Sequence, residues 1–272
     1  MNASRYCFLG AARDCASHLG ELRRQLDRVP GEWKAWFLET NSSDDTRAVL
    51  EAWAKDDSRI HLIEERDYEA PPGHDMRLRT HRLAVYRNVL RDAWITDEKP
   101  GDVVVVLDTD DVVADVPSFL QACKSHPSPW DALFPRTTYD WWALRVKGAS
   151  WNLWELTGLS VIGKADPGMV SALRKALKRA AATAPLRVLS AFNGIGVYKA
   201  EVYKKGTYSG ENRTHSGVSH AWKAALQPCF CGDNRCQRCY CYQRFNEECE
   251  HVNMHQSLGP QAMLHMLPHS YE

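Results

Sequence analysis

Five consecutive apolar residues, Val103–Leu107, are followed within four positions by three aspartates, Asp108, Asp110 and Asp111. An apolar, mostly β-branched run predicts a strand buried on both faces of a parallel sheet. Carboxylates this close need a cation or solvent to offset their charges, and open α/β sheets bind ligands at the carboxyl ends of their strands. The pattern therefore predicts an Asp-x-Asp site that holds Mn²⁺ or Mg²⁺ with a nucleotide-diphosphate substrate. The alternative is a solvated acidic turn in which an aspartate caps the next helix.

Strands and helices alternate over the first 110 residues, which predicts a parallel sheet flanked by helices. The expected strands are 5–10, 33–38, 60–63 and 103–107, and the expected helices are 14–28, 45–55 and 78–94. Farther along, the patterns predict helices over 117–123 and 169–182 and strands over 132–134 and 143–146. Residues 188–198 read as one strand, interrupted at Asn193-Gly194 where a backbone or ligand comes close.

The bulk composition excludes several classes of protein. The 34 basic and 34 acidic residues cancel, whereas a general binder of nucleic acid or anionic membranes usually has a basic excess. No apolar run approaches the roughly 18 residues of a membrane span, and the N-terminus lacks the apolar region of a signal peptide. We expect a soluble, cytoplasmic protein whose 272 residues form one composite domain.

Several segments of the chain together carry a resemblance to a known family. They are Gly10–Cys15, Phe37–Thr46, Leu107–Asp110, Tyr139–Arg145, Asn193–Tyr198 and Cys249–His255, with Arg79, Arg82 and the Arg87-Asn88 pair on the long helix. The chain resembles metal-dependent glycosyltransferases of the GT-A fold. The nearest look-alikes are fungal capsule-type mannosyltransferases and the soluble glycosyltransferases of large DNA viruses of algae. The resemblance implies an α/β fold with a Rossmann-like mixed sheet flanked by helices, in which residues 1–115 bind the nucleotide-sugar and residues 116–272 the acceptor.

The resemblance also implies roles for individual residues. The implied donor-binding residues are Glu39, Asn41, Arg79, Arg82, Asp108, Thr109 and Asp110. Asp108 and Asp110 would meet the metal, and the guanidinium of either arginine would grip the diphosphate or the sugar. These residues also have purely structural interpretations. Glu39 can cap a helix, and arginines on a helix surface are usually solvated.

A histidine near the C-terminus completes the metal shell in many GT-A enzymes. Here His251 and His255 are four residues apart, one turn of a helix. Imidazole is a better ligand for Mn²⁺ than for Mg²⁺, so such a ligand favours Mn²⁺. Of the two we prefer His255.

An inverting transferase needs a general base on the acceptor hydroxyl, whereas a retaining one does not. The candidates are Glu250, Asp140 and Glu211. The resemblance favours Glu250, because inverting GT-A enzymes often place a base at the position before the terminal histidine. Asp140 lies among tryptophans, where it could instead orient the acceptor sugar, and burial would raise its pKa. The predicted acceptor-binding residues are Trp141, Trp142 and Gly194, although core packing is the usual role of a tryptophan.

Six of the nine cysteines lie between Cys229 and Cys249. The spacing of Cys236 and Cys239, with Cys229 or Cys231 upstream, is that of a structural zinc knuckle. In the cytosol, bound zinc or free thiols are expected rather than disulfides. In an oxidising compartment the same cysteines would staple a loop.

The leading hypothesis is thus a sugar transferase that takes a UDP-linked sugar, with UDP-xylose compatible, and a glycan or glycoprotein acceptor. A nucleotidyltransferase shares the carboxylate site, but it would add a glycine-rich phosphate loop with a lysine, of which Gly10-Ala11-Ala12-Arg13 is a poor version. A non-enzymatic, zinc-organised interaction protein would leave the aspartates and tryptophans without a role.

Overall fold

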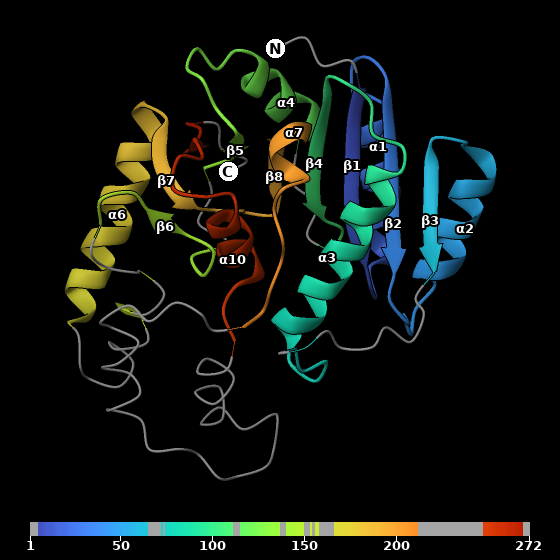
Figure 1. Cartoon of the computed structure of the whole chain (residues 1–272), viewed down its shortest axis with the longest axis horizontal. Coiled ribbons are helices and arrows are strands. Elements are labelled where there is room, and N and C mark those ends of the chain that lie inside the picture. The colour runs from blue at the N-terminus through green and yellow to red at the C-terminus, as the bar shows by residue number, and fades with distance from the viewer. Residues whose placement is uncertain are drawn as a thin grey trace.

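The computed structural model shows a mixed α/β architecture in which the described strands join one sheet (Figure 1). The described residues are 5–64, 72, 74–110, 115–136, 140–149, 153, 156–157, 166–211 and 247–268. The predicted fold class, a mixed sheet with helices on its faces, is confirmed. None of the helices in these ranges is long and apolar enough to cross a bilayer.

Nine described strands lie in the order β3-β2-β1-β4-β8-β5-β9-β7-β6. They are β1 (Arg5–Ala12), β2 (Trp33–Glu39), β3 (Ile60–Glu64), β4 (Asp102–Asp108), β5 (Ala132–Phe134), β6 (Arg145–Val146), β7 (Leu186–Ser190), β8 (Ile195–Lys199) and β9 (Leu264–Met266). The first four are mutually parallel, as predicted. Strand β8 then runs antiparallel between β4 and β5, so the second half of the chain extends the sheet from its middle.

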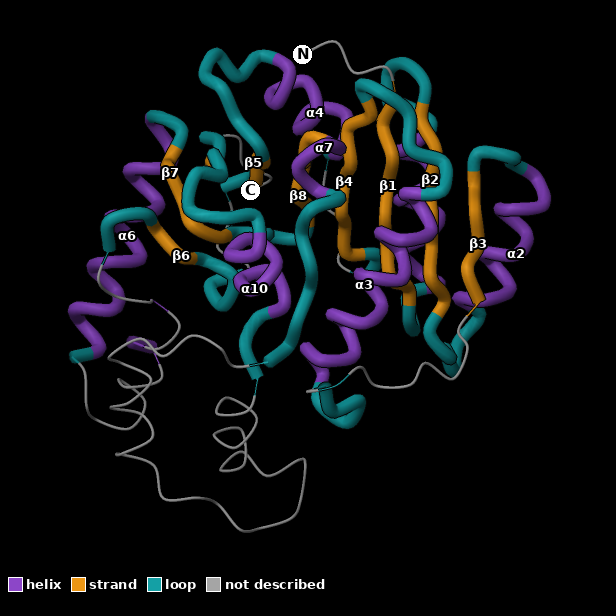
Figure 2. The backbone as a smooth tube through the Cα atoms, viewed as in Figure 1, coloured by secondary structure: helices purple, strands orange, loops and turns teal. Residues whose placement is uncertain are grey.

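The described helices cover both faces of the sheet (Figure 2). They are α1 (Ala16–Leu26), α2 (Thr46–Asp56), α3 (Arg79–Ile95), α4 (Val116–Lys124), α6 (Pro167–Thr183), α7 (Ala200–Tyr203) and α10 (Glu250–Ser257). Apolar side chains of α3, α6 and α10 share one core layer, whereas those of α1, α2 and α4 share the other. The helices expected within the first 124 residues begin and end within about two residues of the prediction, the usual uncertainty of helix ends.

Strand β4 is buried on both faces, as its apolar run predicts. Val104 and Val106 point into the layer under α3 and α10. Val103, Val105 and Leu107 point into the opposite layer, because successive side chains of a strand alternate between faces. Asp108 and Asp110 thereby lie at the end of a strand that is buried on both faces.

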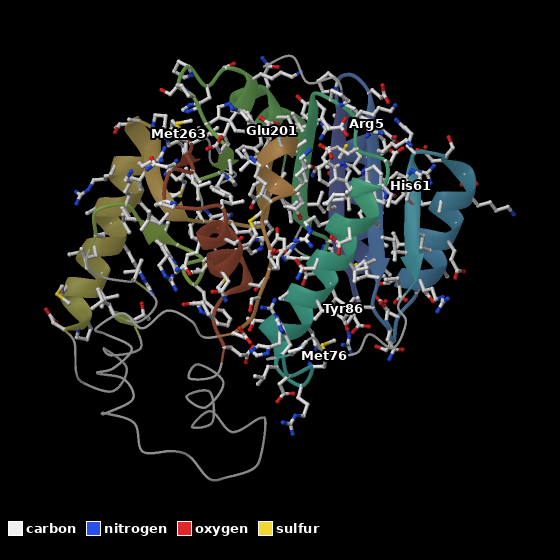
Figure 3. The ribbon with its side chains drawn as sticks, in the orientation of Figure 1. Arg5, His61, Met76, Tyr86, Glu201 and Met263 are labelled. Atoms are coloured by element: carbon white, nitrogen blue, oxygen red, sulfur yellow. The ribbon has the colours of Figure 1, made fainter. Side chains whose placement is uncertain are left out.

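The parallel strands end at a common edge, which places their last residues together. Ala12 is level with Glu39 and Glu64, and Asp108 is level with the residue before Ala12. At the opposite edge the guanidinium of Arg5 donates to the carboxylates of Asp97 and Asp102, both at 2.6 Å. Figure 3 shows Arg5 near the top of the molecule and Met76, which precedes α3, near the bottom.

Residues 188–198 form two strands and not one interrupted strand, which corrects the prediction. Asn193 (φ +60°) and Gly194 (φ +82°) adopt left-handed backbone conformations, so the chain turns there. Strand β7 then pairs with β6 and β9, whereas β8 pairs with β4 and β5. The turn lies against the acidic strand end, since the Gly194 carbonyl accepts a hydrogen bond from the Asp108 amide at 2.9 Å.

Candidate active site

A pocket of about 230 Å³ opens where β4 ends, between α3 and the start of α10. Its lining residues are Arg79, Leu83, Arg87, Asp108, Asp140, Trp141, Trp142, Phe192, Cys249, Glu250 and His251. Seven of the residues predicted from the sequence are therefore brought together, although α10 lies more than 100 positions from the other segments. They are Arg79, Asp108, Asp140, Trp141, Trp142, Glu250 and His251.

Arg87 of α3 joins two carboxylates in this pocket. Its Nη2 donates to Asp108 Oδ1 at 3.0 Å, and its Nε donates to Glu250 Oε1 at 3.2 Å. The arginine side chain is only 4% exposed. Burial by itself would lower the pKa of Arg87, but the two carboxylates more than offset this and hold its pKa above the ordinary value. The guanidinium is therefore a fixed positive charge between the strand end and α10.

Two of the pocket carboxyls have raised pKa values. Burial raises the pKa of Asp108 to about 6, against the opposing effect of Arg87. Burial also raises the pKa of Asp140 to about 6, with Glu250 and Asp108 adding repulsion. The predicted effect of burial on Asp140 is thus confirmed. Carboxyl groups whose pKa values are raised by burial and by neighbouring negative charges are concentrated at functional sites.

Replacing Asp140 by asparagine is expected to stabilise the protein at pH 7.5 and to change little at pH 4. The amide oxygen of the asparagine can still accept the hydrogen bond that Asp140 Oδ1 takes from the Ala143 amide at 3.1 Å. Because the folded-state pKa of about 6 exceeds the unfolded value of about 3.9, the wild type loses stability as pH rises through this window. Allowing for partial exposure, we expect a gain of about 1–2 kcal/mol above pH 6. Urea unfolding at pH 4, 5, 6 and 7.5 measures it, and a pH-independent difference would contradict the prediction.

Three glutamates fix the start of α10 against other parts of the fold. Glu247 Oε2 accepts hydrogen bonds from the amide and hydroxyl of the buried Thr80, both at 2.8 Å, and so caps the start of α3. Glu248 Oε1 accepts from Arg145 Nη2 at 3.0 Å. Glu250 binds Arg87 as described above. The first turn of α10 is therefore held on both sides of the pocket.

His251 and His255 differ in what their ring nitrogens contact. Both nitrogens of His255 are in hydrogen bonds, Nδ1 with Ser190 Oγ at 2.8 Å and Nε2 with the Tyr198 hydroxyl at 2.9 Å. Neither nitrogen of His251 has a hydrogen-bond partner among the described residues, although its Nε2 lies 3.7 Å from Glu250 Oε1. Burial holds the pKa of His251 well below its usual value, so its ring is neutral and keeps a lone pair. The geometry thus favours His251 as the candidate histidine ligand of a metal, whereas the sequence favoured His255.

The His251 ring is also fixed in orientation within the pocket. It stacks on Phe192 with ring centroids 3.7 Å apart and an interplanar angle of 16°. Burial raises the pKa of the neighbouring Cys249 thiol well above the usual value. The residues of α10 that line the pocket are Glu250 and His251.

The remaining predicted site residues do not line the described pocket. The Glu39 carboxylate is buried and accepts a hydrogen bond from the Ser42 amide at 2.7 Å. Thr109 Oγ1 donates to the Ala11 carbonyl at 2.8 Å, so its side chain faces the sheet. Arg82 Nη1 donates to the carbonyls of Met76 and Arg77, both at 3.0 Å. Asn41 and Asp110 are exposed, and Gly194 supplies the turn described above. Glu211 pairs in a β-bridge with Glu247.

The donor atoms present are suited to a divalent cation that a substrate helps to bind. No group of three or more histidine, cysteine or acidic side chains in the described ranges is arranged to hold a metal ion. Mg²⁺ and related ions are usually bound by one or two carboxylates plus substrate phosphates. Asp108 (23% exposed), the exposed Asp110 and the His251 imidazole supply such oxygen and nitrogen atoms. These residues fit the predicted metal, provided that a phosphate group completes its shell.

No site role was predicted from the sequence for four pocket residues, Leu83, Arg87, Phe192 and Cys249. Arg79, Leu83 and Arg87 follow one another at intervals of four on α3, and residues so spaced share one face of a helix. Because Arg79 was already a candidate, this spacing could have identified Arg87. Phe192 carries no comparable signal, since its place beside His251 depends on the turn after it.

The predicted zinc knuckle lies outside the described residues. Cys229, Cys231, Cys236 and Cys239 all belong to the stretch 212–246. The described cysteines are Cys7, Cys15, Cys123 and Cys249, all buried and free.

No protein-family model matches the chain, and no curated protein does. It is similar to the solved structure of a mannosyltransferase from Pyrobaculum calidifontis in complex with GDP-Man and Mn²⁺, with 15% identity and a TM-score of 0.44, over 83% of this chain and 53% of that one. The chain is also similar to TarS 1–349 from S. aureus in complex with UDP, with 13% identity and a TM-score of 0.43, over 82% of this chain and 55% of that one. A third similar structure is glucosyl-3-phosphoglycerate synthase from Mycobacterium tuberculosis in complex with Mn²⁺, UDP and glucosyl-3-phosphoglycerate. Its sequence identity is 15% and its TM-score 0.40, over 82% of this chain and 65% of that one. The chain thus spans between half and two-thirds of these three solved chains.

Proposed function

We propose that the chain is a metal-dependent glycosyltransferase that moves a sugar from a nucleoside-diphosphate donor to a hydroxyl of a glycan, with inversion. The observation that carries the proposal is the meeting of Asp108, Asp140, Glu250 and the neutral His251 in one pocket at the end of β4. A UDP-sugar, with UDP-xylose compatible, remains the preferred donor. A glycoprotein acceptor and a cytoplasmic location belong to the same proposal.

The donor side of the site is the edge formed by β1, β2 and β4. Asp108 and Asp110, with His251 in preference to His255, would hold Mn²⁺ or Mg²⁺ together with the donor diphosphate. When bound, the cation supplies Lewis-acid stabilisation of the departing diphosphate. Of the two predicted arginines, Arg79 and Arg82, Arg79 at the start of α3 lines the pocket, and it would bind phosphate oxygens or the sugar.

Asp140, Trp141 and Trp142 would form the acceptor side, and Glu250 lines the same pocket. In the proposed reaction the acceptor oxygen attacks the anomeric carbon while its proton passes to a Glu250 carboxylate oxygen. The bond between the anomeric carbon and the diphosphate breaks, and the diphosphate leaves with the electron pair. The half-buried tryptophan rings offer apolar faces on which a sugar can stack, and Asp140 can orient its hydroxyls.

Thermal unfolding with metal and nucleotide sugar tests this function. We expect Mn²⁺ and the correct donor together to raise Tm by about 5 °C or more, because ligands that bind only the native state stabilise it by mass action. Either component alone should give a much smaller shift. A panel of UDP- and GDP-sugars, followed by product analysis, identifies the donor. If no combination of metal and donor shifts Tm or is turned over, the proposed function is wrong.

A further inference from the structure

We propose that Arg87 is a positioning residue that sets the separation between the donor-side carboxylate, Asp108, and the general base, Glu250. The inference rests on the proposed function. It adds the residue that holds the donor side and the acceptor side of the site at a fixed separation. Asp108 ends β4 and Glu250 begins α10, so no local structure relates them. The guanidinium of Arg87 is the group that contacts both.

The geometry of these contacts leaves one oxygen of each carboxylate for other partners. The Arg87 guanidinium donates hydrogen bonds to Asp108 Oδ1 and Glu250 Oε1. Among the described residues, Asp108 Oδ2 has no hydrogen bond that would compete with a ligand, and Glu250 Oε2 has only the Cys249 thiol at 4.0 Å. Because a guanidinium is planar and its N–H directions are fixed, it orients both carboxylates at once. A lysine ammonium is a point charge and cannot do so.

Arg87 is itself held by rings and by the anchoring of its helix. Its Cζ lies 4.9 Å from the Phe192 ring centroid and 6.0 Å from that of Tyr208. The next residue, Asn88, exchanges two hydrogen bonds with the Tyr208 backbone, at 2.9 and 3.0 Å. These contacts prevent the guanidinium from following either carboxylate if the other moves.

The fold itself does not require so costly an arrangement. Arg87 Nη1 is buried and has no hydrogen-bond acceptor within the described ranges. Leaving a buried charged nitrogen without a hydrogen bond is unfavourable, and well-packed apolar residues often replace buried ion pairs without loss of stability. A role in catalysis accounts for keeping the arginine, whereas a purely structural role does not.

The experiment compares Arg87→Lys and Arg87→Met with Arg91→Lys and Arg91→Met. Arg91 is a matched control, because it lies one turn farther along α3 and also bonds across to another segment, through the Gly206 carbonyl, but it does not line the pocket. Folding is checked by circular dichroism and urea unfolding. Transfer is measured as kcat and KM, and binding of UDP with Mn²⁺ is measured by calorimetry.

We expect Arg87→Met to lower kcat by about 100-fold, the effect of misplacing reacting groups by about 1 Å, with the Kd for Mn²⁺–UDP changed by less than about fivefold. Arg87→Lys should lose at least about tenfold in kcat despite keeping the charge. Guanidinium ion at millimolar concentration should restore part of the kcat of Arg87→Ala, which a structural role would not predict. The Arg91 variants should keep kcat within about twofold.

Two results would overturn the inference while leaving the proposed function intact. One is a folded Arg87→Lys or Arg87→Met whose kcat stays within about threefold of wild type, well short of the loss that misplaced reacting groups produce. The other is an equal loss of kcat in the Arg91 variants, which would assign the effect to α3 as a whole. If instead the wild type neither binds nor turns over any donor with Mn²⁺, the proposed function itself fails.

Discussion

Replacing Asp110 by alanine is expected to lower kcat by about 10³-fold or more while the chain stays folded. The side chain is exposed, and no hydrogen bond to it is found in the described part of the chain, so unfolding free energy should change by less than about 0.5 kcal/mol. The loss of activity follows from its position after β4, where its carboxylate would help to bind the cation. Metal stabilisation of a leaving group is worth several kcal/mol, and each 1.36 kcal/mol corresponds to about tenfold in rate.

Mn²⁺ titration by calorimetry, alone and with UDP, accompanies the rate measurement for Asp110→Ala. The variant should lose the mutual enhancement between Mn²⁺ and UDP. Asp56→Ala serves as the control, since Asp56 is an exposed aspartate at the end of α2, away from the pocket. Turnover of Asp110→Ala at the wild-type rate would reject the metal role.

Replacing Glu250 by glutamine is expected to lower kcat by about 10²–10⁴-fold, the usual contribution of a general base, with donor affinity preserved. The amide keeps an oxygen that can accept the hydrogen bond from Arg87 Nε, now 3.2 Å from Glu250 Oε1. It cannot take the proton of the acceptor hydroxyl. The kcat therefore falls while the Kd for donor with Mn²⁺ stays within about threefold, because the base acts on the acceptor and not on the donor.

Glu248→Gln is the matched control for Glu250→Gln. Glu248 is also buried and also pairs with an arginine, Arg145 at 3.0 Å, but it does not line the pocket. Its variant should keep most of the wild-type kcat per folded molecule. If Glu250→Gln retains wild-type kcat, a different group is the base, and Asp140 becomes the next candidate.

Local patterns predicted much of the fold. The apolar run Val103–Leu107 predicted a strand buried on both faces because a strand covered on both sides has no solvent-facing positions for polar side chains. Leu19, Leu22 and Leu26 predicted α1 because their spacing puts them on one helix face. The division of residues 188–198 was missed because an Asn-Gly step inside an apolar run is compatible with a bulge as well as with a turn.

The candidate site was predictable in its residue types but not in its pairings. Asp108, Asp140 and Glu250 belong to separate motifs. Asp108 and Asp140 were identified from their neighbours in sequence, and Glu250 from the resemblance. The choice between His251 and His255 depends on the positions of Ser190 and Tyr198, which bond to His255 from β7 and β8. The contact of Arg87 with two carboxylates depends likewise on how α3 and α10 pack. Such long-range contacts leave no periodic signal in the sequence.

An antiparallel bridge joins Glu211 to Glu247. The residues on either side of the stretch 212–246 already sit next to each other, and Asn253 Nδ2 ties them further by donating to the carbonyls of Ser209 and Glu211 at 2.7 and 2.8 Å. The entropy of closing a loop rises only slowly with its length. The entropic cost of holding Glu211 beside Glu247 therefore depends only weakly on the number of residues between them.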